Sequence, residues 1–170
     1  MVASNQHQAN AEAPVQADVA YYLSEARRLE QRRGVSNGHN VQPTRVALAA
    51  NFTATGIRET LLVKCAERGV YAEVYSSPYN QSSQDLLNPR SSLYATTLHL
   101  IIIFHDTRDL LGENALGAFQ MSNDDRRSWV DRKQTELLSL VQGVKNNTTA
   151  RILLHNFVVP MYSPLGILEN

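Results

Sequence analysis

Runs of hydrophobic positions alternate with amphipathic stretches along this chain, an arrangement typical of an α/β protein. The segments Thr44–Ala50 and Leu98–Phe104 are apolar almost throughout, which predicts central strands of a parallel sheet buried on both faces. Val70–Ser76 alternates strictly, with Val70, Ala72 and Val74 on one face and Tyr71, Glu73 and Tyr75 on the other. This alternation predicts a half-exposed strand at a sheet edge. A further apolar segment, Ala150–Phe157, predicts a fourth strand.

Helical spacing and capping residues predict helices before and between the first strands. Asp18 is a suitable cap for a helix that ends at Gly34, and Thr55 for a second helix, Gly56–Arg68. The expected apolar positions of the first helix are Val19, Tyr22, Leu23, Ala26 and Leu29. The expected inward positions of the second are Ile57, Leu61, Leu62 and Cys65.

Two more helices are predicted after the third strand. Thr107–Leu111 begins a short helix, and Ser122 with Asp125 forms a capping-box pattern for a long one that reaches Val141 and stops at Gly143. The expected inward stripe of the long helix is Val130, Leu137, Leu138 and Val141. The remaining connections, residues 77–92 and 112–121, show no clear period and are expected to be irregular.

This order of elements predicts a flavodoxin-like, three-layer α/β/α sandwich with a parallel sheet in the order 2-1-3-4. Residues 1–17 are expected to be a disordered leader, and residues 18–43 an N-terminal helix and linker. Residues 44–170 then form the α/β domain, which we expect to be incomplete at its C-terminus.

Composition narrows the function classes. The chain has 170 residues and a formal net charge of zero, so general electrostatic binding to nucleic acid or to an anionic membrane is not indicated. Its single cysteine, Cys65, excludes an internal disulfide and a cysteine-based zinc site. No apolar run approaches the roughly 20 residues of a membrane helix, and we expect a cytoplasmic protein.

Polar side chains follow the predicted strands where each strand ends. Because the carboxyl ends of parallel strands meet at one edge of a sheet, these residues define the default ligand crevice. The candidate ligand-binding residues are Asn51, Phe52, Thr53, Tyr79, Asn80, Gln81, His105, Asp106, Arg108, Asp109, His155 and Asn156.

Thr53 is the candidate nucleophile, because it lies at the turn from strand to helix. A nucleophilic hydrolase also needs a base within hydrogen-bond reach, and nothing in the spacing places His105 or His155 beside Thr53. Structural capping by Thr53 is therefore favoured over catalysis. A metal site is not indicated either, since no His-x-x-x-His or cysteine pair exists. Arg108 is expected to pair with Asp106 more readily than with a bound anion.

Five short segments, in this order, resemble one family. They are Ala49–Thr53, Pro78–Gln81, Asn88–Tyr94, Thr107–Leu111 and His155–Phe157. The chain from about Val46 to Glu169 is similar to the N-terminal, SGNH-hydrolase-like domain of FkbH-like proteins.

That resemblance implies a function. In the family, a haloacid-dehalogenase (HAD)-type domain follows and carries the chemistry, with Mg expected only in that domain. The usual activity takes a glyceryl unit from 1,3-bisphosphoglycerate, dephosphorylates it and loads it on the phosphopantetheine thiol of an acyl carrier protein, in polyketide and related biosynthesis. This chain has no Asp-x-Asp nucleophile motif, so the phosphatase chemistry is not expected here, nor is any cofactor.

The sequence also departs from active SGNH hydrolases. Thr53 stands at the position of the serine nucleophile, and Arg108 at that of the asparagine oxyanion donor. The terminal Asp-x-x-His is absent. The favoured hypothesis is a degenerate accessory domain that positions substrate or carrier protein for a HAD-type partner domain. The alternatives are a vestigial esterase or acyltransferase that uses Thr53, with Asn80 and the region of Arg108 as oxyanion donors, and an inert interaction module.

The fourth strand carries one more expectation. Ala150–Phe157 is apolar enough to have neighbours on both edges, yet only the third strand is available. We expect this edge to pair in a homodimer, or to be covered by Val158–Leu168 or by the helix Asp18–Arg33.

Overall fold

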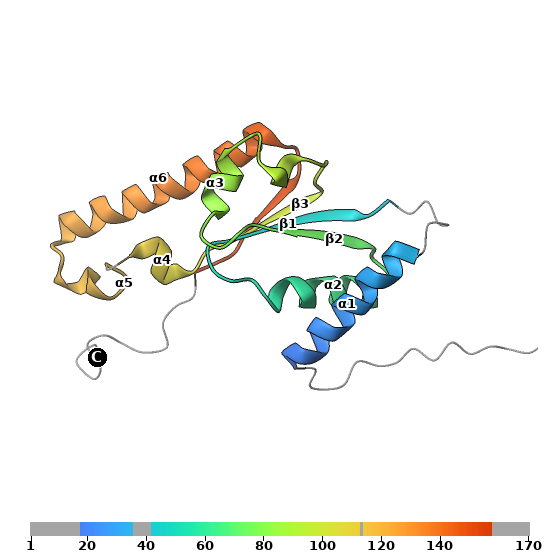
Figure 1. The fold of residues 1–170 in the computed structure, drawn as a ribbon. Coiled ribbons are helices and arrows are strands. Elements are labelled where there is room, and N and C mark those ends of the chain that lie inside the picture. Colours follow the sequence, from blue (N-terminus) through green and yellow to red (C-terminus); the bar gives the residue numbers. More distant parts are fainter. Residues whose placement is uncertain (1–17, 36–41, 113, 158–170) are drawn as a thin grey trace, which may run out of the picture.

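The computed structural model confirms the predicted fold class. The structure describes residues 18–35, 42–112 and 114–157, and its four strands form one all-parallel sheet in the order β2-β1-β3-β4 (Figure 1). The predicted leader, residues 1–17, and the C-terminal segment, residues 158–170, lie outside the described residues. None of the described helices is long and apolar enough to cross a membrane.

The elements follow one another along the chain in the predicted sequence of types, with some additions. The strands are β1 Thr44–Ala50, β2 Ala72–Ser76, β3 Leu100–Phe104 and β4 Arg151–Leu154. The helices are α1 Val19–Val35, α2 Ile57–Glu67, α3 Ser82–Leu87, α4 Thr107–Leu111, α5 Asn114–Gly117 and α6 Asn123–Asn147, with 3₁₀ turns at Ser92–Tyr94 and Ala118–Gln120.

Helices cover the sheet on two faces. On one face α1 and α2 contribute Ala26, Leu62 and Val63 to a core that includes Val46 and Leu48 of β1. We call this the α1/α2 face; it is the lower one in Figure 1. On the opposite α3/α6 face, Leu86, Leu140 and Val144 pack against β1 and β3, with Leu93 of the first 3₁₀ turn. Alternate residues of β1 therefore point into two separate cores.

The strand positions agree with the hydrophobic pattern. β1 has β2 on one side and β3 on the other, and the side chains of its last five residues are buried. β2 lies at the edge, as its alternation predicts: Ala72 and Val74 are buried, whereas Tyr71 is exposed. β3 and β4 begin later than predicted. His99 precedes β3, and its Nδ1 accepts the backbone N–H of Arg45 at 3.0 Å.

Two connections that we expected to be irregular contain helices. Residues 77–92 include α3, and residues 112–121 include α5 and the second 3₁₀ turn. Both were missed because these helices are too short to show a helical period. Leu86 is the fully buried anchor of α3, so tertiary packing rather than local pattern holds this helix.

The predicted end of α6 is wrong. The helix passes through Gly143 and ends at Asn147. A Cβ atom at Gly143 would lie 2.5 Å from Leu87 Cδ2, so this glycine allows α3 and α6 to approach closely. The predicted inward stripe is also rotated. The buried residues of the helix are Trp129, Leu140 and Val144, whereas Val130 and Leu138 are exposed.

The starts of α1 and α2 use different caps. The carboxylate of Asp18 accepts the backbone N–H of Tyr21 at 2.8 Å, as predicted. At α2 the expected cap Thr55 is wrong: the carboxylate of Glu59 accepts the backbone N–H of Gly56 at 2.7 Å. Gly56 has φ of 89°, a backbone conformation that favours glycine. Ile57, expected to point inward, is exposed at this turn, and Val63 is buried instead.

Candidate functional site

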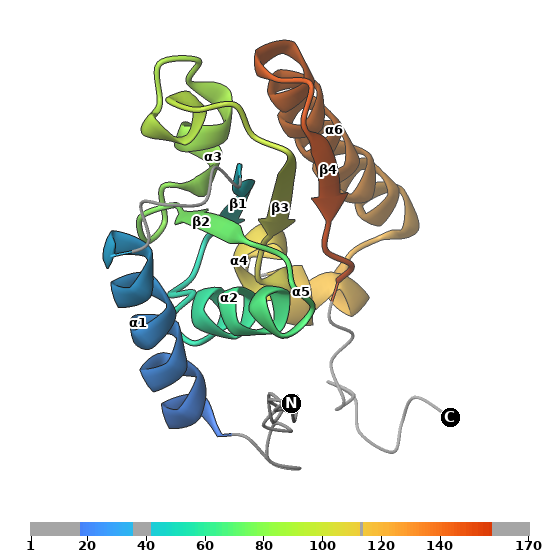
Figure 2. The ribbon, with the colours of Figure 1, turned by 90° about the vertical axis from the view of Figure 1, so that its right-hand side faces the viewer.

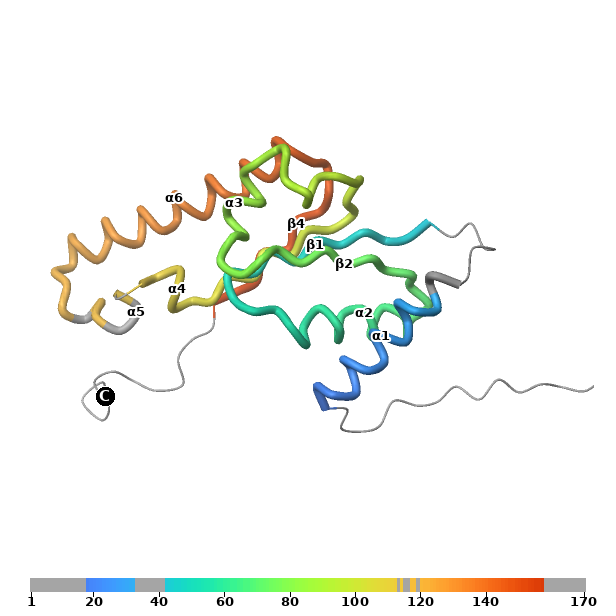
Figure 3. Tube along the Cα trace, viewed as in Figure 1, coloured from blue at the N-terminus to red at the C-terminus, as the bar shows by residue number. Residues whose placement is uncertain are grey.

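The carboxyl ends of β1 and β3 open onto the same end of the sheet, as the trace in Figure 3 shows. Their first polar residues are joined directly. Asn51 Oδ1 accepts a hydrogen bond from the backbone N–H of Asp106 at 2.8 Å. This bond links the segments that follow the two strands at the switch point of the sheet, where ligands bind in open α/β folds.

Asp106 serves the helix that follows it. Its carboxylate accepts the backbone N–H of Arg108 at 2.8 Å and caps α4. The Arg108 guanidinium lies 3.4 Å from the same carboxylate, which is the pairing expected from the sequence. Hydrogen bonding from Arg108 holds the pKa of Asp106 below its ordinary value. Asp109 lies in the first turn of α4, where its negative charge interacts favourably with the helix dipole.

Thr53 lines a hollow of about 230 Å³ at the carboxyl ends of β1 and β2. Its lining is rich in hydroxyl groups, and it comprises Phe52, Thr53, Ala54, Thr55, Arg58, Glu59, Ser76, Ser77 and Tyr79. The Thr53 side chain is exposed, and Tyr79 is 70% exposed. A hollow of this size and chemistry suits a small hydroxylated group.

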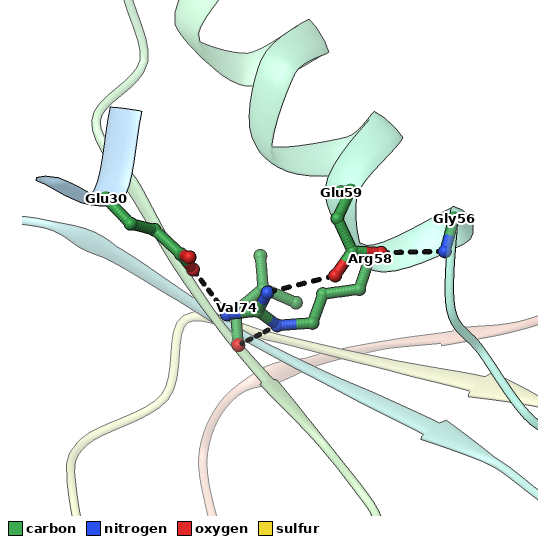
Figure 4. Close-up of polar contacts among 5 residues, drawn as sticks. All are labelled: Glu30, Gly56, Arg58, Glu59 and Val74. Carbon is green, nitrogen blue, oxygen red and sulfur yellow. Dashed lines mark hydrogen bonds and ion pairs between the residues drawn. The ribbon is translucent and has the colours of Figure 1, made fainter. Parts of the chain in front are cut away.

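Arg58 and Glu59 are the charged residues that line the Thr53 hollow. Figure 4 shows their polar contacts. Arg58 donates from Nη2 to Glu30 at 2.7 Å, from Nη1 to Glu59 at 3.2 Å and from Nε to the Val74 carbonyl at 3.3 Å. Partial burial alone would lower the pKa of Arg58, but the hydrogen bonds and charge interactions with Glu30 and Glu59 together outweigh that effect, and the pKa is raised. Burial likewise acts to raise the pKa of Glu59, but the backbone N–H groups of Gly56 and of Glu59 itself, together with the Arg58 guanidinium, outweigh it, so that pKa is lowered. Both groups are therefore held in their charged forms.

His105 lies in a different hollow. Its Nε2 atom is 3.1 Å from Ser82 Oγ, within hydrogen-bond distance, and Ser82 is 1% exposed. Partial burial lowers the pKa of His105, which favours the neutral imidazole. The hollow measures about 410 Å³ and is lined by Ser83, Leu87, His105, Leu110, Thr135, Glu136, Leu137, Ser139 and Leu140. Most of this lining comes from α3, α4 and α6.

His155 belongs to an aromatic row on the α1/α2 face. Its ring stacks on Phe104, with the ring centroids 3.9 Å apart, and Phe104 meets Phe52 edge-on at 5.0 Å. Asn156 uses its side-chain oxygen to accept the backbone N–H of Phe157. These contacts give His155 and Asn156 structural roles at the end of β4.

The structure divides the predicted rim into parts. It joins Asn51 to Asp106, places Thr53 and Tyr79 in one hollow and His105 in another. Asn80 occupies a turn with φ of 54°, a conformation that asparagine tolerates, and Gln81 precedes α3 as its N-cap residue. Within the described part of the chain, no hydrogen bond joins Thr53 to either rim histidine.

Sequence reasoning missed Arg58 and Glu59, which line the Thr53 hollow, and Ser82, which contacts His105. Arg58 and Glu59 lie in the predicted helix after β1, and a capping-box glutamate three residues after Gly56 is a signal that could have drawn attention to them. Ser82 gave no such signal, because its burial depends on α3, which the pattern did not reveal. Among the described residues, no group of three or more potential ligands could hold a metal ion.

The parallel sheet in the order 2-1-3-4, with helices on both faces and residues gathered at the strand ends, defines a doubly wound α/β domain. The chain matches the family described as FkbH, N-terminal domain, over residues 45–160, and it belongs to that family. The sequence matches no curated protein.

A solved structure has a similar fold. It is a crystal structure of the N-terminal part of the protein BF1531 from Bacteroides fragilis, described as containing a phosphatase domain complexed with Mg. The two share 21% sequence identity with a TM-score of 0.60, over 81% of this chain and 33% of that one. The chain therefore spans about a third of the length of this structural neighbour.

Proposed function

We propose that this FkbH-type domain is a binding module that positions substrate or a carrier-bound thiol and has lost the hydrolytic chemistry of its fold. The observation that supports this most strongly is the surroundings of Thr53. It occupies the strand-to-helix turn where the resemblance places a nucleophile, and it lines a hollow without a hydrogen bond to any histidine of the described residues. A threonine without a base is a poor nucleophile at neutral pH.

The two rim histidines already have other roles. His105 is within hydrogen-bond distance of Ser82, and His155 stacks on Phe104. Asp106 is committed to capping α4 and to Arg108. An acid–base partner for Thr53 would have to break one of these contacts. The arrangement therefore supports binding rather than proton transfer.

The Thr53 hollow has the chemistry that a binding role needs. The hydroxyl groups of its lining can form hydrogen bonds to a glyceryl unit or to the end of a phosphopantetheine arm. Arg58 adds a fixed positive charge that is already neutralised by Glu30 and Glu59, so a neutral hydroxylated group is favoured over a multiply charged phosphate.

In this proposal a HAD-type phosphatase domain supplies the chemistry, with Mg as its metal, and an acyl carrier protein is the second partner. The family assignment and the phosphatase domain described for the BF1531 structure support the association. The product would be a glyceryl or related acyl unit loaded on the carrier for polyketide-type biosynthesis.

Thermal-shift measurements on the full chain with pantetheine and with 3-phosphoglycerate test the proposal. We expect pantetheine to raise the melting temperature more than 3-phosphoglycerate, whose phosphate is charged, and Thr53→Trp, which fills the hollow, to abolish the pantetheine shift. Thr135→Trp, which projects into the His105 hollow, is the matched control and should retain it. A shift that survives Thr53→Trp would contradict the proposed site.

A further inference from the structure

The two edges of the sheet differ in how they are protected. Along β2, Ser77 donates its N–H to Leu48, so the odd-numbered residues face β1 and Val74 faces outward. Arg58 reaches across from α2 and donates to the outward Val74 carbonyl (Figure 4). A charged side chain therefore occupies this edge, as is common where edge pairing must be prevented.

The β4 edge has no comparable cover among the described residues. The backbone N–H groups of Arg151 and His155 donate towards β3, so Ile152 and Leu154 direct their backbone groups away from the sheet. β4 has β3 as its one neighbour in the sheet. An apolar strand of this kind is a template for a further extended segment.

The α1/α2 face is also incompletely covered near this edge. Ile101 and Ile103 on the α3/α6 face of β3 are fully buried, whereas Ile102 on the opposite face is half-buried. Its neighbour on β4, Leu153, is 48% exposed. Figure 2 shows α6 packed beside β4, while α1 and α2 lie under the β2 and β1 half of the sheet. Parallel sheets normally bury both faces.

A polar atom marks the same region as incomplete. His155 stacks on Phe104 at the end of this face, and its buried Nδ1 atom has no hydrogen-bond partner among the described residues. An unpaired buried nitrogen destabilises the folded state. A backbone segment docked beside His155 could supply the hydrogen bond that Nδ1 lacks.

We propose that residues 158–170 dock on this surface, which consists of the α1/α2 face of β3 and β4 together with the free edge of β4. The segment begins directly after Phe157, at the border of the surface. It is apolar at Val158, Val159, Met161, Tyr162, Leu165, Ile167 and Leu168, and Glu169 is its one charged residue. Pro160 and Pro164 disfavour a helix there, so the segment binds as an extended strap.

Length and tethering favour this occupant over a second copy of the chain. Thirteen residues can span up to about 43 Å when extended, several times the length of a four-residue strand. A covalently attached segment binds at an effective concentration in the millimolar range. A second copy at micromolar concentration would have to displace it. The helix Asp18–Arg33, a third expected cover, is excluded because α1 packs against α2 in the other core.

A double-mutant cycle on the unfolding equilibrium tests the docking. The four proteins are the full chain, Leu153→Asn, a chain ending at Phe157, and the combination. We expect Leu153→Asn to lower the folding constant about fivefold in the full chain, from the apolar area that the strap covers, and to have little effect in the shortened chain. Leu138→Asn, at a leucine that is 60% exposed on α6, is the matched control and should behave alike in both.

An equal effect of Leu153→Asn in both chains would overturn the proposal. Concentration-dependent dimerisation would also overturn it if the dimer persisted after removal of residues 158–170 and disappeared with Leu153→Asn. That result would assign the surface to a second copy of the chain. If the shortened chain does not fold, methyl NMR on the full chain decides. In a Cys65→Ser background, a nitroxide at Leu165→Cys should broaden the Leu153 methyl signals and spare those of Leu138; unbroadened Leu153 signals would contradict the docking.

Discussion

The side-chain oxygen of Asn51 accepts the backbone N–H of Asp106 over 2.8 Å, although the two residues are 55 positions apart in sequence. This single bond ties the end of β1 to the start of α4 across the switch point. It gives Asn51 a structural role that a search for ligand-binding residues does not anticipate.

Asn51→Ala should destabilise the domain. The substitution leaves the half-buried Asp106 N–H without its acceptor, which costs about 1–2 kcal/mol of unfolding free energy. Urea unfolding measures the change. Asn156→Ala is the matched control, because the exposed Asn156 bonds to the N–H of its own neighbour. Equal losses in the two variants would argue against a special role for the Asn51 bond.

Stability should fall in mild acid because of His105. Burial lowers the pKa of this histidine in the folded state, so as the pH falls the unfolded chain takes up the proton first. The contribution of neutral His105 to the unfolding free energy is complete above the ordinary histidine pKa of about 6.5 and decreases as the pH drops through that value. His105→Gln removes the titration, and the slope of unfolding free energy between about pH 7.5 and pH 5.5 should become shallower. An unchanged slope would contradict this assignment.

Much of this architecture could be predicted from the sequence, because uniform apolarity and strict alternation report how many faces of a strand are buried. The strand order, the edge position of β2 and the bounds of β1 and α4 follow from that pattern. Short helices such as α3 are not detected by this pattern, since a helix of six residues with one fully buried leucine, Leu86, shows no helical period. Gly143 was misinterpreted for a related reason: its small size serves the contact with Leu87 instead of ending the helix.

The candidate site was harder to predict, because parallel strand ends share an edge without sharing a cavity. Thr53 and His105 both follow central strands, yet the side chains line separate hollows. The direction of each side chain depends on the turn after its strand. Arg58 lines one hollow from α2, and Ser82 contacts His105 from α3. The contacts of these two residues with Glu30 and His105 bridge distant parts of the chain.

Arg58 should matter for both stability and solubility. Arg58→Met removes the donor to the Val74 carbonyl and leaves Glu30 and Glu59 without their shared partner. We expect a loss of about 1–3 kcal/mol in urea unfolding and increased association in sedimentation, because the β2 edge is freed. Arg45→Met, which breaks a separate ion pair with Glu73, is the control. A soluble Arg58→Met protein of unchanged stability would show that the network is dispensable.

The isolated chain should not hydrolyse short activated esters. Without a positioned base, a rate lower by about 10²–10⁴-fold is expected even if the hydroxyl is correctly placed. Thr53→Ser should not restore turnover, because it supplies a better nucleophile but no histidine. The assay follows release of p-nitrophenol from p-nitrophenyl acetate. Turnover that Thr53→Ala abolishes in a folded protein, and that Thr55→Ala leaves intact, would instead support the vestigial esterase.

The most direct test of a positioning role is a calorimetric titration of the full chain with an acyl carrier protein, in its apo form and with the phosphopantetheine arm attached. The account predicts that the phosphopantetheinylated carrier binds more tightly than the apo form. It also predicts that Thr53→Trp removes this difference and that Thr135→Trp preserves it. Equal affinity for both carrier forms, or a preference that survives Thr53→Trp, would contradict the account.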